Sequence, residues 1–342
     1  MFYQWIRNFT LKRKQKLLNN IQMKKVFILA ISCTMIFACK NDQKIVSESS
    51  GNLNNLTVVA SNDQWNGNVG EAIREILAAP VDGLPQDEPL FSMKQMPMEV
   101  FSGFTAKNRT ALIIKSGPAN FELKEDLYAK PQTVIVISGN SDDEIIRVLK
   151  ENGAKIVSEF KKTEITEKQR RIKKSLHNVS TIENNLGVTL NFPSAYRIAK
   201  EEDKFFWIRK DITTGSMNLM IYQVPLTAIT EGDNTVNQII KIRDSIGEKH
   251  IPGEKDGSYL ITEQAYSPFF FKEIVDNKPT FVTKGTWEVK DVIMGGPFIN
   301  YAIEDKINNR YIVAEGFTFA PSVQKRDFMF ELEAIIKSIH IK

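Results

Sequence analysis

A stretch of helical periodicity divides this sequence into two halves with different patterns. Its apolar residues are 7, 4, 3, 3 and 4 positions apart, which places them on one face of a helix: Ile165, Ile172, Leu176, Val179, Ile182 and Leu186. Before this stretch, short β-branched runs alternate with helical segments, and after it strands dominate. We therefore expect a helix over residues 158–186 that connects two domains.

The first half, residues 56–157, has the pattern of an α/β layered domain. Helices are expected over Val69–Ala79 and over Asp142–Asn152, with Gly153 ending the second. Four apolar runs predict strands: Leu56–Ala60, Leu90–Gln95, Thr110–Lys115 and Thr133–Ser138.

The second half, residues 187–342, predicts an α+β domain with a largely antiparallel sheet. Asn308 and Asn309 suggest a hairpin turn between the last two strands, and helices are expected over Val236–Lys249 and Val323–Ile339. The fold class expected for the whole chain is α+β. The expected strands are Val188–Phe192, Phe205–Lys210, Met217–Gln223, Tyr259–Gln264, Phe269–Val275, Thr280–Val289, Phe298–Asp305 and Asn308–Phe319.

Residues 1–38 predict a secretory signal peptide rather than part of the fold. Lys24 and Lys25 precede thirteen apolar or small residues, Val26–Ala38, which is shorter than the roughly 20 that a membrane-spanning helix needs. Met23 begins a signal of conventional shape, so Met1 and Met23 are both candidate starts.

The stretch Ile36–Cys39 resembles a bacterial lipobox. This resemblance implies that Cys39 carries acyl chains such as palmitate and becomes the first mature residue, and more than one chain gives stable anchoring. The alternative is that Cys39 ends a signal anchor. Residues 39–55 would be the lipidated N-terminus and a flexible tether. Removal of Cys33 with the signal excludes disulfides, thiolate catalysis and Cys-ligated zinc.

The net charge of +4 comes from the signal segment. Residues 1–38 hold seven basic residues and no acidic one, whereas the remaining chain has 38 basic against 41 acidic residues. A nucleic-acid partner is therefore excluded, because such proteins present a basic surface. Lys40 and Asn41 follow Cys39 where Asp would argue for inner-membrane retention, so we expect the outer membrane. The face of that membrane stays open.

The segment after the first strand is a candidate ligand site. Its two glycines and a helix start would bring free backbone N–H groups together, which suits an anion. Neither a GxGxxG nor a P-loop pattern is present, and a tight turn with a tryptophan packed on the core is the alternative. The candidate residues are Trp65, Asn66, Gly67, Gly70 and Arg74.

A proline-framed acidic loop over residues 81–91 follows, and its Asp82, Asp87 and Glu88 could hold a cation or cap nearby N–H groups. We predict no metal site and no cofactor. Asp87 and Glu88, together with Arg109, are added to the candidate ligand residues.

Motifs of known catalytic centres such as HExxH, GxSxG and SxxK are missing, so no catalytic residue is assigned. Carboxylate-only hydrolysis needs just two acids and stays possible. The aromatic cluster Tyr266 and Phe269–Phe271 is expected in the core, and Gly295–Pro297 is expected to be a turn.

The lipobox, Trp65–Gly67, Gly70, Ala79–Pro80 and Gly83–Pro89 together resemble an uncharacterised lipoprotein family of the Bacteroidota, catalogued as a domain of unknown function. The resemblance implies a cell-envelope lipoprotein and supplies no catalytic residues. The second half is also similar to sandwich domains of the PsbP and Mog1 type, which are binding or assembly modules. That similarity concerns strand order and the closing helix, and is fold-level analogy.

We therefore expect a lipid-anchored envelope protein that binds a ligand or an envelope protein partner and is not an enzyme. One alternative is a carboxylate-dependent envelope hydrolase that acts on glycan or peptidoglycan. A structural spacer within an envelope assembly is another.

Overall fold

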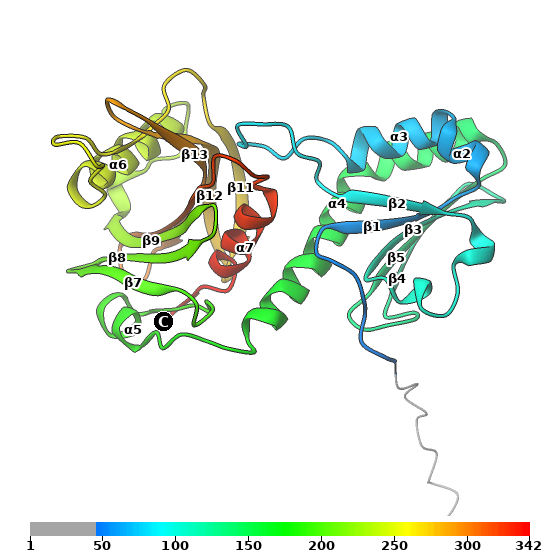
Figure 1. The fold of residues 1–342 in the computed structure, drawn as a ribbon, viewed down its shortest axis with the longest axis horizontal. Helices are drawn as coiled ribbons and strands as arrows, with labels where there is room; N and C mark the ends of the chain where they lie inside the picture. Colours follow the sequence, from blue (N-terminus) through cyan, green and yellow to red (C-terminus); the bar gives the residue numbers. More distant parts are fainter. Residues whose placement is uncertain (1–45) are drawn as a thin grey trace, which may run out of the picture. The chain divides into compact units, whose positions relative to one another are not determined.

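The computed structural model describes residues 46–342 (Figure 1). The expected signal peptide, the alternative start at Met23 and the lipidation of Cys39 lie outside these residues. The described chain forms two domains with mixed helices and strands, which confirms the α+β fold class. None of the helices within residues 46–342 has the length and apolar composition that crossing a membrane requires.

The first domain is built on a five-stranded sheet in the order β2-β1-β3-β5-β4. Its strands are β1 (Asn55–Val59), β2 (Ser92–Met96), β3 (Thr110–Ser116), β4 (Asn120–Glu125) and β5 (Thr133–Gly139). All neighbours pair in parallel except β4, which runs antiparallel to β5 at the sheet edge. The central strands are buried on both faces, which explains their continuous apolar runs. The sequence did not predict β4, because its half-exposed edge position allows charged residues.

Three helices pack their apolar residues on one face of this sheet: α2 (Asn62–Asn66), α3 (Asn68–Leu77) and α4 (Asp142–Ile172). The prediction that Gly153 ends the last helix is wrong, because α4 runs through this position and has 31 residues in all. Gly153 lies where α3 crosses α4, and a Cβ atom there would be 3.3 Å from Cγ2 of Ile76. The glycine therefore serves helix packing. The opposite face is covered by a segment with two short 3-10 helices, η1 (Met98–Val100) and η2 (Thr105–Lys107).

The expected single helix over residues 158–186 is interrupted. Helix α4 ends at Ile172, and a separate helix α5 (Ser180–Leu186) follows. Between them the chain hydrogen-bonds to a later segment, with His177 N donating to the carbonyl of Phe192. The apolar periodicity continues across the break because both helices contribute residues to one core.

The second domain contains an eight-stranded sheet in which every neighbouring pair is antiparallel, as predicted. The order is β10-β12-β13-β14-β9-β8-β7, and β11 also pairs with β12. The strands are β7 (Arg197–Glu202), β8 (Phe205–Ile212), β9 (Gly215–Pro225), β10 (Leu260–Thr262), β11 (Phe269–Val275), β12 (Lys278–Val289), β13 (Val292–Asp305) and β14 (Arg310–Phe319).

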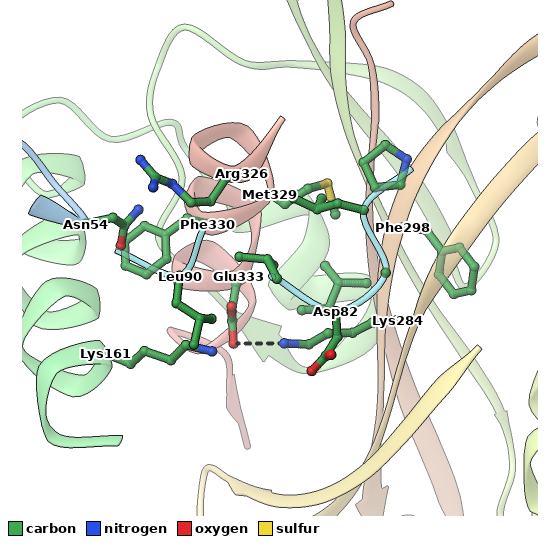
Figure 2. Close-up of a pocket in the computed structure, with 15 residues that line it drawn as sticks. Asn54, Asp82, Leu90, Lys161, Lys284, Phe298, Arg326, Met329, Phe330 and Glu333 are labelled. Carbon is green, nitrogen blue, oxygen red and sulfur yellow. Dashed lines mark ion pairs between the residues drawn. The ribbon is translucent and has the colours of Figure 1, made fainter. Parts of the chain in front are cut away.

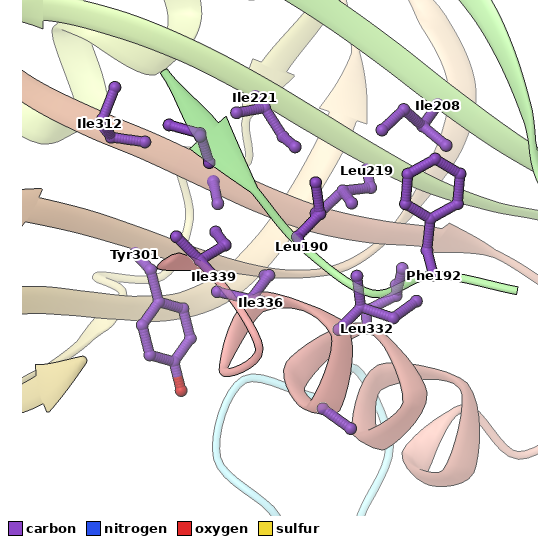
Figure 3. Packing of buried hydrophobic residues seen from close by; sticks show 14 of the residues in the cluster. Leu190, Phe192, Ile208, Leu219, Ile221, Tyr301, Ile312, Leu332, Ile336 and Ile339 are labelled. Atoms are coloured by element: carbon purple, nitrogen blue, oxygen red, sulfur yellow. The ribbon is translucent and has the colours of Figure 1, made fainter. Parts of the chain in front are cut away.

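Helix α7 (Arg326–Ile336) packs on one face of this sheet, together with the small ladder of β6 (Val188–Thr189) and β15 (His340–Ile341). Figure 3 shows the aliphatic side chains of α7, including Leu332 and Ile336, meeting those of the strands.

On the other face lies α6 (Thr235–His250), with the 3-10 helix η3 (Leu226–Ala228) nearby. A fully buried ion pair ties α6 to the sheet, where Nε of Arg243 is 2.8 Å from Oε1 of Glu315. Helices thus cover both faces of the second sheet.

Residues 46–55 fall in the segment for which the sequence predicts a flexible tether. Part of this segment is nevertheless paired with the first domain. The backbone N–H of Ser50 donates to the carbonyl of Lys107, and Ser49 N–H donates to the carbonyl of Lys130. Apart from Val46 and Leu53 the segment is polar, so its attachment through backbone hydrogen bonds leaves little hydrophobic signal.

Candidate functional site at the domain junction

The N-terminus of α7 is capped by a carboxylate from the first domain. Oε1 of Glu88 accepts a hydrogen bond from Lys325 N at 2.7 Å, and Oε2 accepts one from Arg326 N at 2.9 Å. Glu88 is only 3% exposed. A carboxylate at this end of a helix is favoured by the helix dipole and by charge-assisted hydrogen bonding. Glu88 therefore joins the domains, which agrees with the capping alternative for the acidic loop.

A second link connects α4 to α7. Glu331 on α7 forms ion pairs with Lys168 of α4 and, at 2.7 Å, with Lys210 of β8. It also accepts a hydrogen bond from the Tyr196 hydroxyl at 2.8 Å. Burial would raise the pKa of Glu331, but the two lysines outweigh this effect and lower it. The carboxylate is therefore ionised at the junction.

Between these links lies a small cavity of about 40 Å³. Figure 2 shows Lys161 of α4 and Lys284 of β12 extending from different elements toward the carboxylate of Glu333 on α7. The volume suits one or two water molecules rather than an organic ligand. This cavity is therefore a polar seam between the domains.

Glu333 is the electrostatic centre of the seam. It accepts a hydrogen bond from the Tyr301 hydroxyl at 3.0 Å, and its Oε1 is 3.4 Å from Nζ of Lys337 and 4.0 Å from Nζ of Lys284. Burial alone would raise its pKa. Lys284, Lys337 and Lys161 together outweigh burial and lower the pKa of Glu333 to about 2.

The acidic loop also packs directly on the second domain through two glycines. Gly83 has a φ of +82°, and a Cβ atom on it would lie 2.8 Å from the backbone nitrogen of Gly285 in β12. Only glycine combines this backbone conformation with such a close approach. The loop thereby forms one wall of a larger depression on the sheet.

We call this depression the aromatic pocket. It has a volume of about 780 Å³ and is formed by the acidic loop, the segment before β11, and the paired ends of β12 and β13. Its lining residues are Gly83, Leu84, Pro85, Glu263, Tyr266, Ser267, Phe269, Gly285, Thr286, Trp287, Glu288, Val292, Ile293, Met294, Gly295 and Gly296.

Two predictions are wrong at this pocket. Tyr266 is 74% exposed and Phe269 is 49% exposed, so these residues are at the surface rather than in the core. Tyr266 precedes β11, and Phe269 is the first residue of that strand, where it pairs with Lys284 of β12. Gly295–Pro297 is not a turn but part of β13, paired with Thr286–Glu288 of β12.

The first candidate ligand segment is helical rather than a loop. Ser61 begins α2 with a complete capping box to Gln64, and α3 starts directly after Gly67. A Cβ atom on Gly70 would lie 1.9 Å from the carbonyl oxygen of Trp65, so this glycine allows the two helices to approach.

The side chains of this segment are engaged with one another. Nη1 of Arg74 donates to the carbonyl of Trp65 at 3.1 Å, and the guanidinium lies over the Trp65 ring at 4.8 Å. Asn66 is exposed. The stacked pair matches the alternative in which the tryptophan packs within the domain.

Arg109 lies elsewhere, beneath α4. It is 1% exposed and forms an ion pair with Glu164, with Nε and Oε1 separated by 3.0 Å. Its Nη2 donates to the carbonyls of Gly51 and Asn52. The guanidinium therefore bonds to groups of the first domain rather than to a ligand.

The structure thus does not gather the candidate residues into one site. Asp87 is exposed and Asp82 lines the small cavity, whereas Glu88 caps α7. Within residues 46–342 no three His, Cys, Asp or Glu side chains converge as a metal ion would need.

Three lysines at the junction of the domains could not be grouped from the sequence, because they are far apart in the chain: Lys161, Lys284 and Lys337. The aromatic pocket does have a sequence signal, namely the aromatic residues near Tyr266. The sequence analysis assigns these residues to the core.

Comparison with known proteins divides the chain near the end of α4. Residues 49–173 match the model of a domain of unknown function, DUF8532, and residues 175–338 match that of another, DUF4837. No curated protein matches the chain in sequence.

Weak structural similarity exists to three solved proteins. The Ran-binding protein Mog1p of Saccharomyces cerevisiae is 8% identical with a TM-score of 0.29, covering 45% of this chain and 89% of Mog1p. LpqN of Mycobacterium tuberculosis, involved in cell envelope biogenesis, is 10% identical with a TM-score of 0.27, covering 44% of this chain and 81% of LpqN. A protein from Bacteroides thetaiotaomicron is 15% identical with a TM-score of 0.21, covering 45% of each chain. The two family models thus match consecutive stretches of the chain, and the change from one to the other falls directly after helix α4.

Proposed function

We propose that this chain is a lipid-anchored protein of the cell envelope that binds a ligand without catalysing a reaction. The single observation that carries the binding role is the aromatic pocket. Its volume of about 780 Å³ falls within the range of small-molecule sites, roughly 300–1,000 Å³, and such sites often form where two domains meet. The anchor and the outer-membrane location rest on the lipobox-like stretch Ile36–Cys39 and the residues after it.

The walls of the pocket indicate the kind of ligand. Tyr266, Phe269 and Trp287 contribute aromatic surface, and Glu263 and Glu288 are the charged residues of the lining. A neutral or cationic ligand with an apolar body fits such a lining, because aromatic faces and carboxylates both attract cations. The ligand expected here therefore differs in charge from the anion that the sequence suggested for residues 65–74.

Native mass spectrometry of the protein purified in detergent from its own membranes tests the binding role. We expect a co-purifying small molecule with the wild type and its loss from a Tyr266→Ala/Phe269→Ala double variant. Both side chains are exposed, so the fold should tolerate their removal. Tyr128→Ala, an exposed aromatic residue of the first domain, is the matched control. Retention of the same molecule by the double variant would contradict this site.

A separate experiment tests the anchor and the partner. Metabolic labelling with palmitate and membrane fractionation should show a labelled membrane protein for the wild type and an unlabelled soluble one for Cys39→Ala. A stoichiometric envelope protein that co-purifies only with the anchored form would support an assembly role. Labelling of the variant would exclude Cys39 as the acylated residue.

A carboxylate-dependent hydrolase acting on glycan or peptidoglycan is the second candidate. The version built on Asp82, Asp87 and Glu88 lacks support, because the three do not converge. Glu263, directly after β10, and Glu288 of β12 nevertheless line one pocket. Two acids in one cleft are the minimum for this chemistry. Release of reducing sugar from peptidoglycan that disappears in both Glu263→Gln and Glu288→Gln would favour the hydrolase over the binding protein.

A further inference from the structure

A second depression, with the opposite charge, borders the small cavity and shares Lys161, Lys284 and Glu333 with its lining. This depression, which we call the lysine groove, has a volume of about 590 Å³ and is formed by α4 of the first domain and by β11, β12 and α7 of the second. It shares no lining residue with the aromatic pocket. Its lining residues are Ala154, Val157, Ser158, Lys161, Lys162, Ile165, Thr166, Glu273, Lys284, Phe330, Glu333 and Lys337.

The acids of the groove are already paired within the protein. Glu273 is 2.9 Å from Nζ of Lys337. Glu333 interacts with the same lysine, with Lys284 and with the Tyr301 hydroxyl. Four lysines thus face two carboxylates, which leaves the lining with an excess of positive charge.

Lys161 is the lysine that the protein leaves without a direct partner. Among residues 46–342, no carboxylate lies within ion-pair distance of its ammonium group, whereas Lys162 is 3.8 Å from Glu159. Figure 2 shows its side chain reaching from α4 into the space beside Glu333. Burial lowers the pKa of Lys161, and the neighbouring Lys284 and Lys337 lower it further despite the opposing effect of Glu333. A partly buried cation beside other cations is costly, and an anion in the groove would relieve that cost.

The rest of the lining is apolar. Val157 and Ile165 of α4 and Phe330 of α7 provide hydrocarbon surface next to the lysines. An inorganic ion would leave this surface in contact with water, whereas an anion with a hydrocarbon body would cover it.

We propose that the lysine groove binds an amphipathic organic anion, whose phosphate or carboxylate group contacts Lys161 and Lys284 and whose apolar body lies against Val157, Ile165 and Phe330. Because α4 belongs to the first domain and Lys284 to the second, the ligand bridges the two domains. This inference is independent of the aromatic pocket and of the anchor.

Isothermal titration calorimetry with octyl phosphate, below its micelle concentration, tests the proposal on the chain from residue 40 onward. We expect Lys161→Met and Lys284→Met to weaken binding about tenfold or more, because each removes a charge-assisted contact. Lys161→Arg, which keeps the charge, should bind within a few-fold of the wild type. Lys150→Met, on the same helix but paired with Glu75 outside the groove, is the matched control and should not change binding.

Two further ligands separate the contribution of the charge to binding from that of the hydrocarbon chain. Octyl glucoside has the same chain without the charge, and inorganic phosphate has the charge without the chain, so both should bind far more weakly than octyl phosphate. Equal binding of octyl glucoside would overturn the role of the lysines, and equal binding of inorganic phosphate would overturn the amphipathic class. Absence of octyl phosphate binding to the wild type would overturn the site itself, provided that circular dichroism shows a folded chain.

The source of such an anion is a separate question that vesicles answer. If the ligand is a lipid headgroup, the same chain should co-sediment with phosphatidylglycerol vesicles and Lys161→Met should not. If the ligand is a free molecule, octyl phosphate binds in calorimetry while vesicles of any composition leave the protein in solution.

Discussion

Glu88 places its carboxylate between the backbone N–H groups of Lys325 and Arg326, so a residue of the first domain caps a helix of the second. Glu88→Ala would leave these N–H groups without their acceptor, and Lys325 is buried as well. We expect a loss of about 2 kcal/mol in the free energy of unfolding, measured by urea denaturation. Asp87→Asn at the exposed neighbouring position should change the free energy of unfolding by less than about 0.5 kcal/mol. Equal effects of the two substitutions would mean that the cap contributes nothing.

The buried ion pair of Arg109 and Glu164 predicts a strong asymmetry between single and double variants. Arg109→Met should cost about 3–5 kcal/mol, because it leaves the carboxylate of Glu164 buried without its countercharge. Arg109→Met combined with Glu164→Leu should cost less than the sum of the two single changes, since neither charge is then left unpaired. Chemical denaturation of all three variants gives the coupling energy. Arg147→Met removes an exposed pair with Glu151 and should cost no more than about 1 kcal/mol. Additive costs at Arg109 and Glu164 would show that the pair is not coupled.

Glu333 predicts a pH dependence of stability. Its pKa is lowered from 4.5 to about 2, so the unfolded chain binds the proton more readily than the folded chain. The corresponding stabilisation, about 3 kcal/mol, is complete above pH of about 4.5 and is lost as the pH falls toward 2.

The measurement is urea unfolding of the wild type and Glu333→Gln at several pH values. Their difference in free energy should be large at pH 7 and should shrink between pH 4.5 and 2. Other carboxylates titrate in both proteins and cancel in this difference. A difference that does not vary with pH would contradict the lowered pKa.

Two helical glycines should respond differently to substitution by alanine. Gly70→Ala would place Cβ 1.9 Å from the backbone oxygen of Trp65, so α2 and α3 must separate, at a cost of about 2–3 kcal/mol. Gly153→Ala meets only the flexible side chain of Ile76 at 3.3 Å, and the gain in helix propensity, up to about 1 kcal/mol, offsets that contact. Thermal unfolding followed by circular dichroism compares the two. A larger loss at Gly153 than at Gly70 would mean that the helix crossing is tighter than the turn.

Local patterns in the sequence predicted most of the strands, because a buried strand such as Thr110–Ile114 consists of consecutive residues that are mostly apolar. The same is true of the antiparallel second sheet and of the hairpin at Asn309, which has a φ of +53°. The sequence-based predictions were wrong where the conformation of a residue depends on a contact with a residue far away in the chain. Gly153 looks like a helix end and instead accommodates Ile76. Residues 47–50 look like a tether because they are held by backbone hydrogen bonds and polar side-chain contacts rather than by apolar packing.

The candidate site was less predictable than the fold for the same reason. Trp65 and Arg74 are close in sequence and do meet, but their contact is internal to the first domain. The lysine groove is lined by residues that are more than a hundred positions apart in the chain, and a single sequence does not show that such residues lie close together. Charged residues also look alike whether they cap a helix, as Glu88 does, or face a ligand.

Helix α4 has a consequence for how ligands would enter and leave. Its 31 residues correspond to a rod of about 46 Å at 1.5 Å per residue, packed at one end in the core of the first domain and at the other against α7. Bending between the domains would require breaking backbone hydrogen bonds in the middle of this rod. The lysine groove, which α4 lines, is therefore preformed, and we expect its ligand to associate at a rate set by diffusion and charge rather than by closure of one domain upon the other.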